Sequence, residues 1–305
     1  SIFKVVTGAA LVEAGVPLNE KFCYPGGGEH GITERMLEPD DRRDKWCATL
    51  GTAMGRSINV IFARQAKQHL DQDALTGVAR RMGYGLDIPF DVPLKPSTID
   101  LPDEELEFAR AAAGFWHTTL SPVQGANLAQ TVATGGELLR MRIVDRVLDE
   151  NDEPIWEAPK ERRRLKRVLN EKTAWAVARM MEQTVTKGTS FRTFHDRAGR
   201  PFLPKIRVAG KTGTLAKKKP ETLYTWWVGF APADKPEVAI SAVVLNRGAW
   251  KIKGTHVASD MLRVYFADHG RKGVHYPPGF RGPKRRFAPK KAKKSEKTRA
   301  ASDKG

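Results

Sequence analysis

The order of its elements most constrains what this chain can fold into, because apolar helices come first and strands come last. Residues 1–14 are apolar on nearly every face of a helix, which indicates burial inside a domain. Three strand-like runs follow late in the chain, at residues 206–214, 223–231 and 237–246. The turn at residues 232–236 makes the last two runs antiparallel neighbours. The chain therefore predicts an α+β fold, in which an antiparallel sheet is flanked by helices.

Two helices between these regions carry clear boundary signals. Ser121 suits the N-cap of a helix that begins at Pro122, and Gly135 suits its end. An amphipathic helix is expected between Asn170 and Gly188. Composition agrees with a folded body, since 305 residues with 40% hydrophobic side chains can bury a sizeable core.

The net charge of +17 is concentrated at the C-terminal end. Residues 271–305 hold 13 Lys and Arg against 2 Asp and Glu, a net charge of +11, which leaves +6 for residues 1–270. The segment 271–305 is poor in aliphatic residues, so it is predicted to be a basic, disordered tail. It either attaches to an anionic surface, such as phospholipid or wall polymer, or serves only as a solubilising extension. Its charge lies on no folded face, so no specific nucleic-acid partner is predicted.

The two cysteines, Cys23 and Cys47, allow two interpretations. A disulfide would close a loop, contribute roughly 3 kcal/mol and indicate an oxidising compartment. Two buried free thiols fit the pair equally well. A metal site is not predicted, because two cysteines without C-x-x-C spacing and histidines without an i, i+4 pair do not form a ligand set.

No run of about 18 apolar residues is present, so no membrane-spanning helix is predicted. The chain starts with Ser in place of Met, and its first residues already have the pattern of a buried helix. We therefore expect a fragment whose N-terminal part is absent. A signal peptide or membrane anchor would lie in that part.

Three short motifs occur once each and in a fixed order. Ser1 and Lys4 form S-x-x-K at the start of the buried helix, and Ser57 and Asn59 form S-x-N. The sequence K-T-G-T at residues 211–214 lies on the first strand-like run. Each motif alone is weak, since ordinary Ser and Lys usage produces about one S-x-x-K by chance in a chain of this length. Together, and in these contexts, they indicate a site built around a serine nucleophile.

Ser1 and Lys4 carry the chemistry of the first motif. Residues three apart on a helix lie on one face with Cβ atoms about 5–6 Å apart, so the amine can reach the hydroxyl. A serine hydroxyl needs an adjacent base to become a good nucleophile. A lysine is such a base when burial and a nearby cation lower its pKa, and Lys211 would supply the cation. The alternative is that Lys4 is an ordinary surface lysine.

The other two motifs supply candidate binding groups. Ser57 and Asn59 point the same way in an extended or turn segment, where a hydroxyl and an amide can relay a proton and orient a substrate amide. The alternative for Ser57 is an ordinary helix N-cap. Residues 211–214 alternate between two faces of a strand, and Gly213 is expected to let a substrate backbone approach closely. The alternative for this segment is an edge strand with a glycine bulge.

The set of motifs resembles that of the penicillin-binding proteins and serine β-lactamases. The resemblance covers about residues 1–268. It includes three further parts, namely Leu120–Gln124 with Ala133–Gly136, Val185–Thr189 and Trp227–Pro232. Cys23 and Cys47 fall where some family members carry paired cysteines, so the resemblance implies a disulfide. It also implies a β-lactamase/transpeptidase-like fold with an all-helical subdomain, from which the strands before the first motif are missing.

Spacing favours a peptidoglycan D,D-transpeptidase within this superfamily. S-x-N follows the first motif by 56 residues, and K-T-G follows S-x-N by 154. The second gap is long, as in the high-molecular-weight transpeptidases. No E-x-x-L-N-like carboxylate motif follows S-x-N, which disfavours a class A β-lactamase. Residues 227–234 resemble the class B, monofunctional enzymes. The resemblance thus implies a transpeptidase domain over residues 1–270 that needs no cofactor.

The family mechanism assigns a role to each matching residue. Ser1 attacks the carbonyl between the two terminal D-alanines of a stem peptide, and Lys4 takes its proton. Ser57 relays the proton to the departing D-alanine, and Asn59 holds Lys4 and the substrate amide. The backbone amides of Ser1 and Thr214 form the oxyanion hole. The terminal carboxylate is received by Lys211, Thr212 and Thr214.

The implied partners are stem peptides, as acyl donor and amine acceptor, and β-lactams, which acylate Ser1. The implied location is the extracytoplasmic face of the bacterial cytoplasmic membrane, with anchoring through the missing N-terminal segment. Three alternatives remain. A D,D-carboxypeptidase and a β-lactam-sensing receptor that is acylated without turnover share the same motifs. An N-terminal-nucleophile hydrolase would use the amine of Ser1 as its base, but it has no use for S-x-N or K-T-G.

Overall fold

The computed structural model describes residues 1–27, 31–161, 163–218, 221–248 and 251–280. The elements run, in chain order, α1 (Lys4–Glu13), β1 (Phe22–Tyr24), α2 (Glu34–Leu37), β2 (Trp46–Ala48), α3 (Leu50–Arg56), α4 (Asn59–His69), α5 (Gln72–Arg81), α6 (Glu105–Ala112), α7 (Pro122–Ala133), β3 (Glu137–Leu139), β4 (Arg146–Leu148), β5 (Pro154–Glu157), β6 (Arg164–Arg167), α8 (Glu171–Thr186), α9 (Phe191–Phe194), β7 (Ala209–Lys218), β8 (Glu221–Ala231), β9 (Val238–Arg247) and α10 (Gly254–Asp268).

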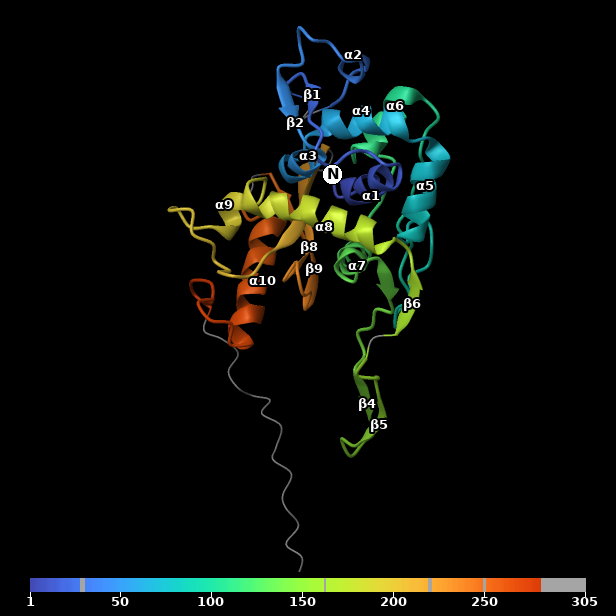
Figure 1. Cartoon of the computed structure of the whole chain (residues 1–305). Coiled ribbons are helices and arrows are strands. Elements are labelled where there is room, and N and C mark those ends of the chain that lie inside the picture. The colour runs from blue at the N-terminus through green and yellow to red at the C-terminus, as the bar shows by residue number, and fades with distance from the viewer. Residues whose placement is uncertain (28–30, 162, 219–220, 249–250, 281–305) are drawn as a thin grey trace, which may run out of the picture.

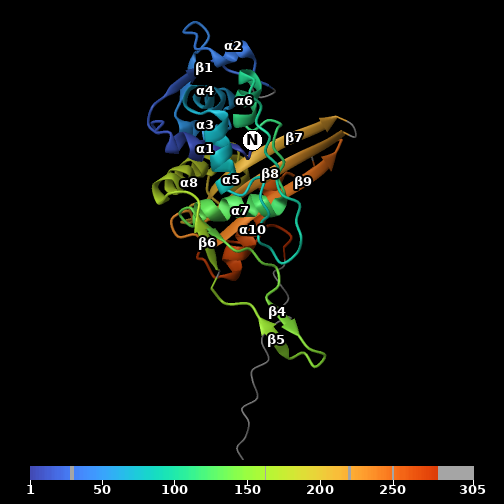
Figure 2. The ribbon, with the colours of Figure 1, turned by 90° about the vertical axis from the view of Figure 1, so that its right-hand side faces the viewer.

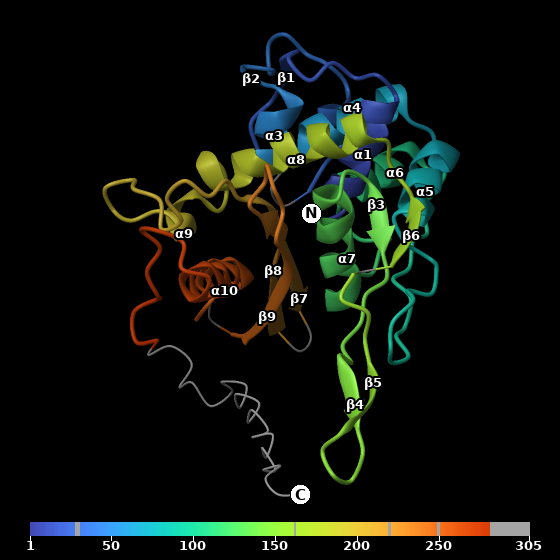
Figure 3. The same ribbon diagram turned by 60° about the horizontal axis from the view of Figure 1, so that its bottom comes forward.

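The last three strands form one antiparallel sheet in the order β7–β8–β9. Lys211 of β7 lies opposite Val228 of β8, and Val228 lies opposite Ser241 of β9. Figure 3 shows α7 on one side of this sheet and α10 on the other. The predicted α+β fold is confirmed. The first strand begins three residues later than expected, at Ala209, and continues to Lys218.

A group of helices, α1 to α6, lies beyond one end of the sheet, as Figures 1 and 2 show. Residues 4–11 of α1 are all buried, as its apolar sequence predicted. This helix contacts α3, α4, α5 and α8, so it occupies the centre of the helical part. The N-cap expected for α7 is present, because Ser121 accepts from the backbone N–H of Gln124. Asn170 caps α8 in the same way and accepts from the backbone N–H of Thr173. The S-x-x-K motif therefore lies at the start of a helix that other helices enclose.

Two glycines allow α3 to pack closely against the end of α8. A Cβ atom on Gly188 would lie only 2.1 Å from the carbonyl oxygen of Gly55. Since bare backbones meet here, the N–H of Thr189 donates to the Gly55 carbonyl at 3.0 Å. This contact ties the segment after α8 to the end of α3, directly before Ser57.

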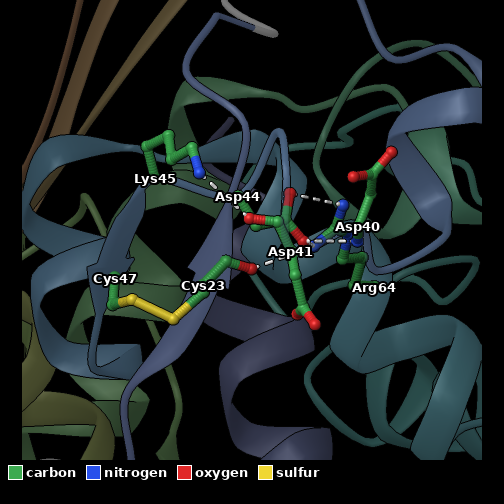
Figure 4. Close-up of a disulfide and its surroundings, with 7 residues drawn as sticks. All are labelled: Cys23, Asp40, Asp41, Asp44, Lys45, Cys47 and Arg64. Carbon is green, nitrogen blue, oxygen red and sulfur yellow. Dashed lines mark hydrogen bonds and ion pairs between the residues drawn. A yellow bond between two sulfur atoms is a disulfide. The ribbon is translucent and has the colours of Figure 1, made fainter.

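Cys23 and Cys47 are bonded in a disulfide with an S–S distance of 1.97 Å. They lie directly opposite each other in the two-stranded sheet of β1 and β2. Of the two interpretations that the pair allowed, the structure therefore contains the disulfide. Figure 4 shows the disulfide together with Arg64, a residue of α4 that bonds to the backbone carbonyl of Cys23.

Arg64 holds the disulfide-bonded loop against α4. Its side chain is buried and donates to both carboxylate oxygens of Asp44, at 2.7 and 3.1 Å. It also donates to the backbone carbonyl of Cys23 at 2.9 Å. The carbonyls of Met36 and Glu38 accept further bonds from the same guanidinium. The loop therefore depends on one buried cation as well as on the disulfide.

The hairpin of β4 and β5 projects away from the rest of the molecule in Figures 1, 2 and 3. Near the C-terminus, the predicted disordered tail is wrong for residues 271–280, which lie against α10. Arg263 of this helix donates to the carbonyls of His275 and Tyr276 at 3.1 and 2.9 Å. Composition missed this order, because it does not reveal contacts with distant residues, such as these arginine bonds and the burial of Val274 in the core. The rest of the predicted tail lies outside the described residues.

Candidate active site

The fold brings the three motifs together from three different elements. Ser1 lies at the start of α1, while Ser57 and Asn59 lie where α3 ends and α4 begins. Lys211 lies on β7. The side chain of Ile2 packs against this strand at Gly213. Two lysine side chains make the connections between the motifs.

Lys4 connects the first motif to the second. Its ammonium lies 3.5 Å from the hydroxyl oxygen of Ser1 and donates to Oδ1 of Asn59 at 2.7 Å. It also donates to the backbone carbonyl of Ala113. Lys4 is completely buried, so the alternative that it is an ordinary surface lysine is wrong. The spacing of three along a helix places amine and hydroxyl side by side.

Burial changes the charge state of both lysines of the site. It lowers the pKa of Lys4 well below its usual value, and the charge of Lys211 lowers this pKa further. Burial also lowers the pKa of Lys211 to about 7. A cation taken out of water with no carboxylate partner loses its proton more easily. The lowered pKa moves Lys4 toward the neutral form that a proton acceptor needs.

Lys211 connects the third motif to the second. Its ammonium donates to the hydroxyl oxygen of Ser57 at 2.9 Å and to the carbonyl of Thr212 at 2.8 Å. Ser57 has a left-handed backbone, with φ of 58°, and forms the C-cap of α3. The alternative that Ser57 is a helix N-cap is wrong, because Ile58 holds that position in α4. The left-handed turn lets Ser57 face one lysine and Asn59 the other.

The remaining residues of the third motif face three different surroundings. The hydroxyl of Thr212 lies 2.7 Å from that of Thr189. A Cβ atom on Gly213 would lie 3.0 Å from the side chain of Ile2, so this glycine makes room for Ile2. The space that a Gly213 side chain would fill is taken by Ile2 and is not open to a substrate backbone. The structure therefore does not support the prediction that Gly213 lets such a backbone approach. Thr214 is exposed, and its side chain has no hydrogen bond to any residue that the structure describes.

Three contacts of the site were not found from the sequence. The carbonyl of Gly114 accepts from the nitrogen of Ser1 at 2.5 Å, so this nitrogen, expected in the oxyanion hole, is bonded within the protein. Gly114 has φ of +81°, and a Cβ atom there would lie 2.7 Å from Cα of Ser1. The other two contacts are that of the Ala113 carbonyl with Lys4 and that of the Thr189 hydroxyl with Thr212. Backbone carbonyls carry almost no signal in a sequence, and only Gly114 could have pointed to a close approach.

The site contains no metal-binding group that we can identify. Within the described residues, no cluster of three or more His, Cys, Asp and Glu side chains is placed to hold an ion.

A groove of about 1000 Å³ lies between β9 and α10, but none of the motif residues lines it. The candidate site is therefore where the motif residues contact one another, because reacting groups must touch. In the described part of the chain, no helix has both the length and the apolar character needed to cross a bilayer.

Replacing Lys211 by glutamine is expected to move the acidic limb of the rate of acylation to higher pH. The charge of Lys211 lowers the pKa of Lys4, so its removal raises that pKa, and Lys4 becomes neutral only in more alkaline solution. The pH dependence of the second-order rate with a fluorescent penicillin measures this limb. Lys172→Gln, a change at an exposed residue of α8, is the control. An unshifted limb in Lys211→Gln would contradict the coupling of the two lysines.

Comparison with known proteins agrees with the fold. Residues 1–263 match the family model of the penicillin binding protein transpeptidase domain. Since the match covers most of the chain, this protein belongs to the penicillin-binding protein transpeptidase family.

Relatives of known name are similar over most of this chain but are longer. The peptidoglycan D,D-transpeptidase PbpA of Mycobacterium tuberculosis H37Rv is 27% identical over 268 residues, which are 84% of this chain and 51% of PbpA. Stage V sporulation protein D of Bacillus subtilis is 26% identical over 85% of this chain and 40% of its own length. The chain thus spans about half the length of such relatives or less.

A solved structure shows the same fold. The D,D-transpeptidase domain of a peptidoglycan glycosyltransferase from Eggerthella lenta has a TM-score of 0.71 and 25% sequence identity, and the match covers 88% of this chain and 65% of that one. Penicillin-binding protein A of M. tuberculosis, solved as an imipenem acyl-enzyme complex, has a TM-score of 0.66 and 23% identity over 85% and 57% of the two chains. This second likeness concerns the fold alone.

Proposed function

We propose that this chain is a peptidoglycan D,D-transpeptidase domain that works through an acyl-serine intermediate. The observation that carries the proposal is the buried ammonium of Lys4, which lies 3.5 Å from the hydroxyl of Ser1 and 2.7 Å from the amide oxygen of Asn59. A lysine with a lowered pKa beside a serine hydroxyl is the arrangement needed to activate that serine. Family membership supplies the substrate class.

The acylation step assigns the bond changes to named atoms. Ser1 Oγ attacks the carbonyl carbon between the two terminal D-alanines and forms an ester, while its proton passes to Nζ of Lys4. The peptide bond breaks, and the amine of the leaving D-alanine takes a proton by way of the Ser57 hydroxyl, which Lys211 holds at 2.9 Å. The backbone N–H of Thr214 is the candidate donor to the oxyanion, and one such donor is worth roughly 3 kcal/mol.

The second step releases the enzyme. The amine of a neighbouring stem peptide attacks the ester carbonyl, a new amide forms and Ser1 Oγ regains a proton, so that two stem peptides become cross-linked. A β-lactam acylates the same oxygen by opening its ring. Asn59, which accepts from Lys4, orients this lysine and the substrate amide in both steps.

The setting of the domain is part of the same proposal. The catalytic unit comprises residues 1–270, and its stem-peptide substrates place it at the extracytoplasmic face of the bacterial cytoplasmic membrane. The disulfide between Cys23 and Cys47 supports such an oxidising compartment. An anionic surface remains the proposed partner of the basic C-terminal segment.

Labelling with a fluorescent penicillin, followed by gel and by intact mass, tests the site. Wild-type protein is expected to gain the mass of one penicillin, and Ser1→Ala is expected to gain none, because the acylated oxygen is absent. Circular dichroism of both proteins is the control for folding. A folded wild-type protein that forms no adduct would remove the acyl-serine proposal.

Product analysis then separates the three functions that share the site. The protein is incubated with a D-Ala-D-Ala stem peptide and an amine acceptor, and the products are identified by mass. A cross-linked peptide supports the transpeptidase. Hydrolysed peptide without cross-links would favour a carboxypeptidase, and a stable acyl adduct with neither product would favour a β-lactam receptor.

A further inference from the structure

The turn that follows α6 contacts both reacting residues of the first motif. The carbonyl of Ala113 accepts a hydrogen bond from the amine of Lys4, and the carbonyl of Gly114 accepts one from the nitrogen of Ser1. Neither carbonyl belongs to one of the three motifs. Because a hydrogen bond weakens steeply as its geometry departs from the optimum, the placement of the Lys4 amine depends on how firmly this turn is held.

One carboxylate holds the far end of the turn. Oε2 of Glu107, on α6, accepts from the indole N–H of Trp116 at 2.6 Å and lies 2.9 Å from Nε2 of His117. Hydrogen bonds from His117, Trp116 and Arg110 lower the pKa of Glu107 to about 2, so this residue is a charged acceptor near neutral pH. Glu107 therefore ties the end of the turn back to the helix from which the turn leaves.

Glu107 is itself held in place by Arg110, one turn further along α6. Its second oxygen, Oε1, accepts from the guanidinium of Arg110. This guanidinium also donates to the carbonyl of Ile32, at 2.8 and 2.6 Å, and lies 5.8 Å from the centre of the Trp116 ring. The indole is thus fixed at its N–H and over its ring by two residues of the same helix.

The backbone of His117 shows that the turn needs this support. Its φ of 70° lies in the left-handed region, which residues with a Cβ atom rarely adopt. Such a conformation persists only where the surroundings impose it. Here Glu107 holds the ring of His117, and the N–H of Asp100 donates to its carbonyl at 3.0 Å. Without the carboxylate, one of these two restraints is lost and the turn is free to relax.

We propose that Glu107 is a positioning residue for acylation, which holds the turn of residues 113–117 so that its carbonyls fix Lys4 and Ser1. The carboxylate bonds to Arg110, Trp116 and His117 and acts on the reacting groups through the turn. The inference rests on the proposed function, since it concerns the amine that takes the proton of Ser1.

Glu107→Gln is expected to lower the second-order rate of acylation by a fluorescent penicillin by about 10- to 100-fold. The amide has one acceptor oxygen where the carboxylate uses two, and a small displacement of a reacting group has an effect of this size. Glu137→Gln is the matched control and is expected to keep the wild-type rate. Glu137 is 19% exposed against 28% for Glu107, and it pairs with two arginines of β6 outside the site.

The pH dependence of the same rate separates positioning from a general loss of structure. The Ala113 carbonyl favours the charged form of Lys4, so loosening this contact lowers the pKa of Lys4. The acidic limb is therefore expected to move to lower pH, opposite to the shift expected for Lys211→Gln. The variants retain the charged or titratable groups that face the two residues, namely Lys211 and the nitrogen of Ser1 beside Lys4, and Arg110 and His117 beside Glu107.

Two further variants separate position from charge and from folding. Glu107→Asp keeps the charge but is one methylene shorter, so it is expected to lose rate and to shift the limb as Glu107→Gln does. Trp116→Phe keeps an aromatic ring at an exposed position and removes only the N–H that Glu107 accepts. It is expected to shift the limb in the same direction with a smaller loss of rate. Circular dichroism and urea unfolding show that each variant is folded.

Four results would overturn the proposal. They are a wild-type rate in Glu107→Gln, an equal loss in Glu137→Gln, a lower rate with an unmoved acidic limb, and wild-type behaviour of Glu107→Asp. The third would leave Glu107 a structural role alone, and the fourth would assign its effect to charge. Failure of the proposed function is distinguishable from all four, because the folded wild type would then form no adduct at any pH.

Discussion

Lys4→Ala is expected to lower the second-order rate of acylation by penicillin by about 10²- to 10⁴-fold, the usual contribution of a general base. The reason is that the amine of Lys4 lies 3.5 Å from the Ser1 hydroxyl and has a strongly lowered pKa. Stopped-flow fluorescence with a labelled penicillin measures the rate. Ser1→Ala sets the background at which no adduct forms.

Lys4→Met controls for the packing that alanine removes. The side chain of Lys4 is completely buried, and methionine has a similar volume without the amine. Both variants are expected to lose the same factor in rate. A variant that keeps more than about a tenth of the wild-type rate would show that another group is the base.

Arg64→Met is expected to destabilise the protein by about 3–5 kcal/mol, the cost of removing one partner from a buried ion pair. Asp44 would be left buried without its cation, since the side chains of Arg64 and Asp44 are only 8% and 6% exposed. Three backbone carbonyls of the loop would lose a donor as well. Urea unfolding followed by tryptophan fluorescence measures the free energy of unfolding.

Arg200→Met is the matched control for this change. Arg200 also pairs with a carboxylate at 2.7 Å, that of Asp196, but its side chain is 82% exposed. An exposed pair contributes about 0–1 kcal/mol, so this variant is expected to unfold at nearly the wild-type urea concentration. Equal losses in the two variants would mean that burial of the Arg64 pair has no special importance.

Acylation by penicillin should separate the two largest effects. Lys4→Ala removes a group at the reacting atoms, whereas Arg64 lies on α4 five residues after Asn59 and touches none of the reacting groups. Under conditions where Arg64→Met is folded, its acylation rate is expected to remain close to that of the wild type. Stability and chemistry thus reside in residues of different helices, Arg64 on α4 and Lys4 on α1.

The sequence by itself determined the order of the elements and their boundaries where local chemistry sets them. Ser121 caps α7 and Asn170 caps α8 because a side-chain oxygen next to a free N–H acts over three residues, whatever the rest of the fold does. The alternation on β7 buries Lys211 and exposes Thr214 in the same way. Residues 271–280 show the limit, since their order depends on contacts with other elements that composition does not reveal, such as the bonds from Arg263 and the burial of Val274.

Only the tertiary structure decided the environment of the site. The pKa values of Lys4 and Lys211 depend on how much water the rest of the fold removes, and neither burial nor distance between motifs is written in a motif. The space beside Gly213 of β7 is filled by Ile2, a residue from the opposite end of the sequence. Such features arise from contacts between residues far apart in sequence, and these appear only once the chain is folded.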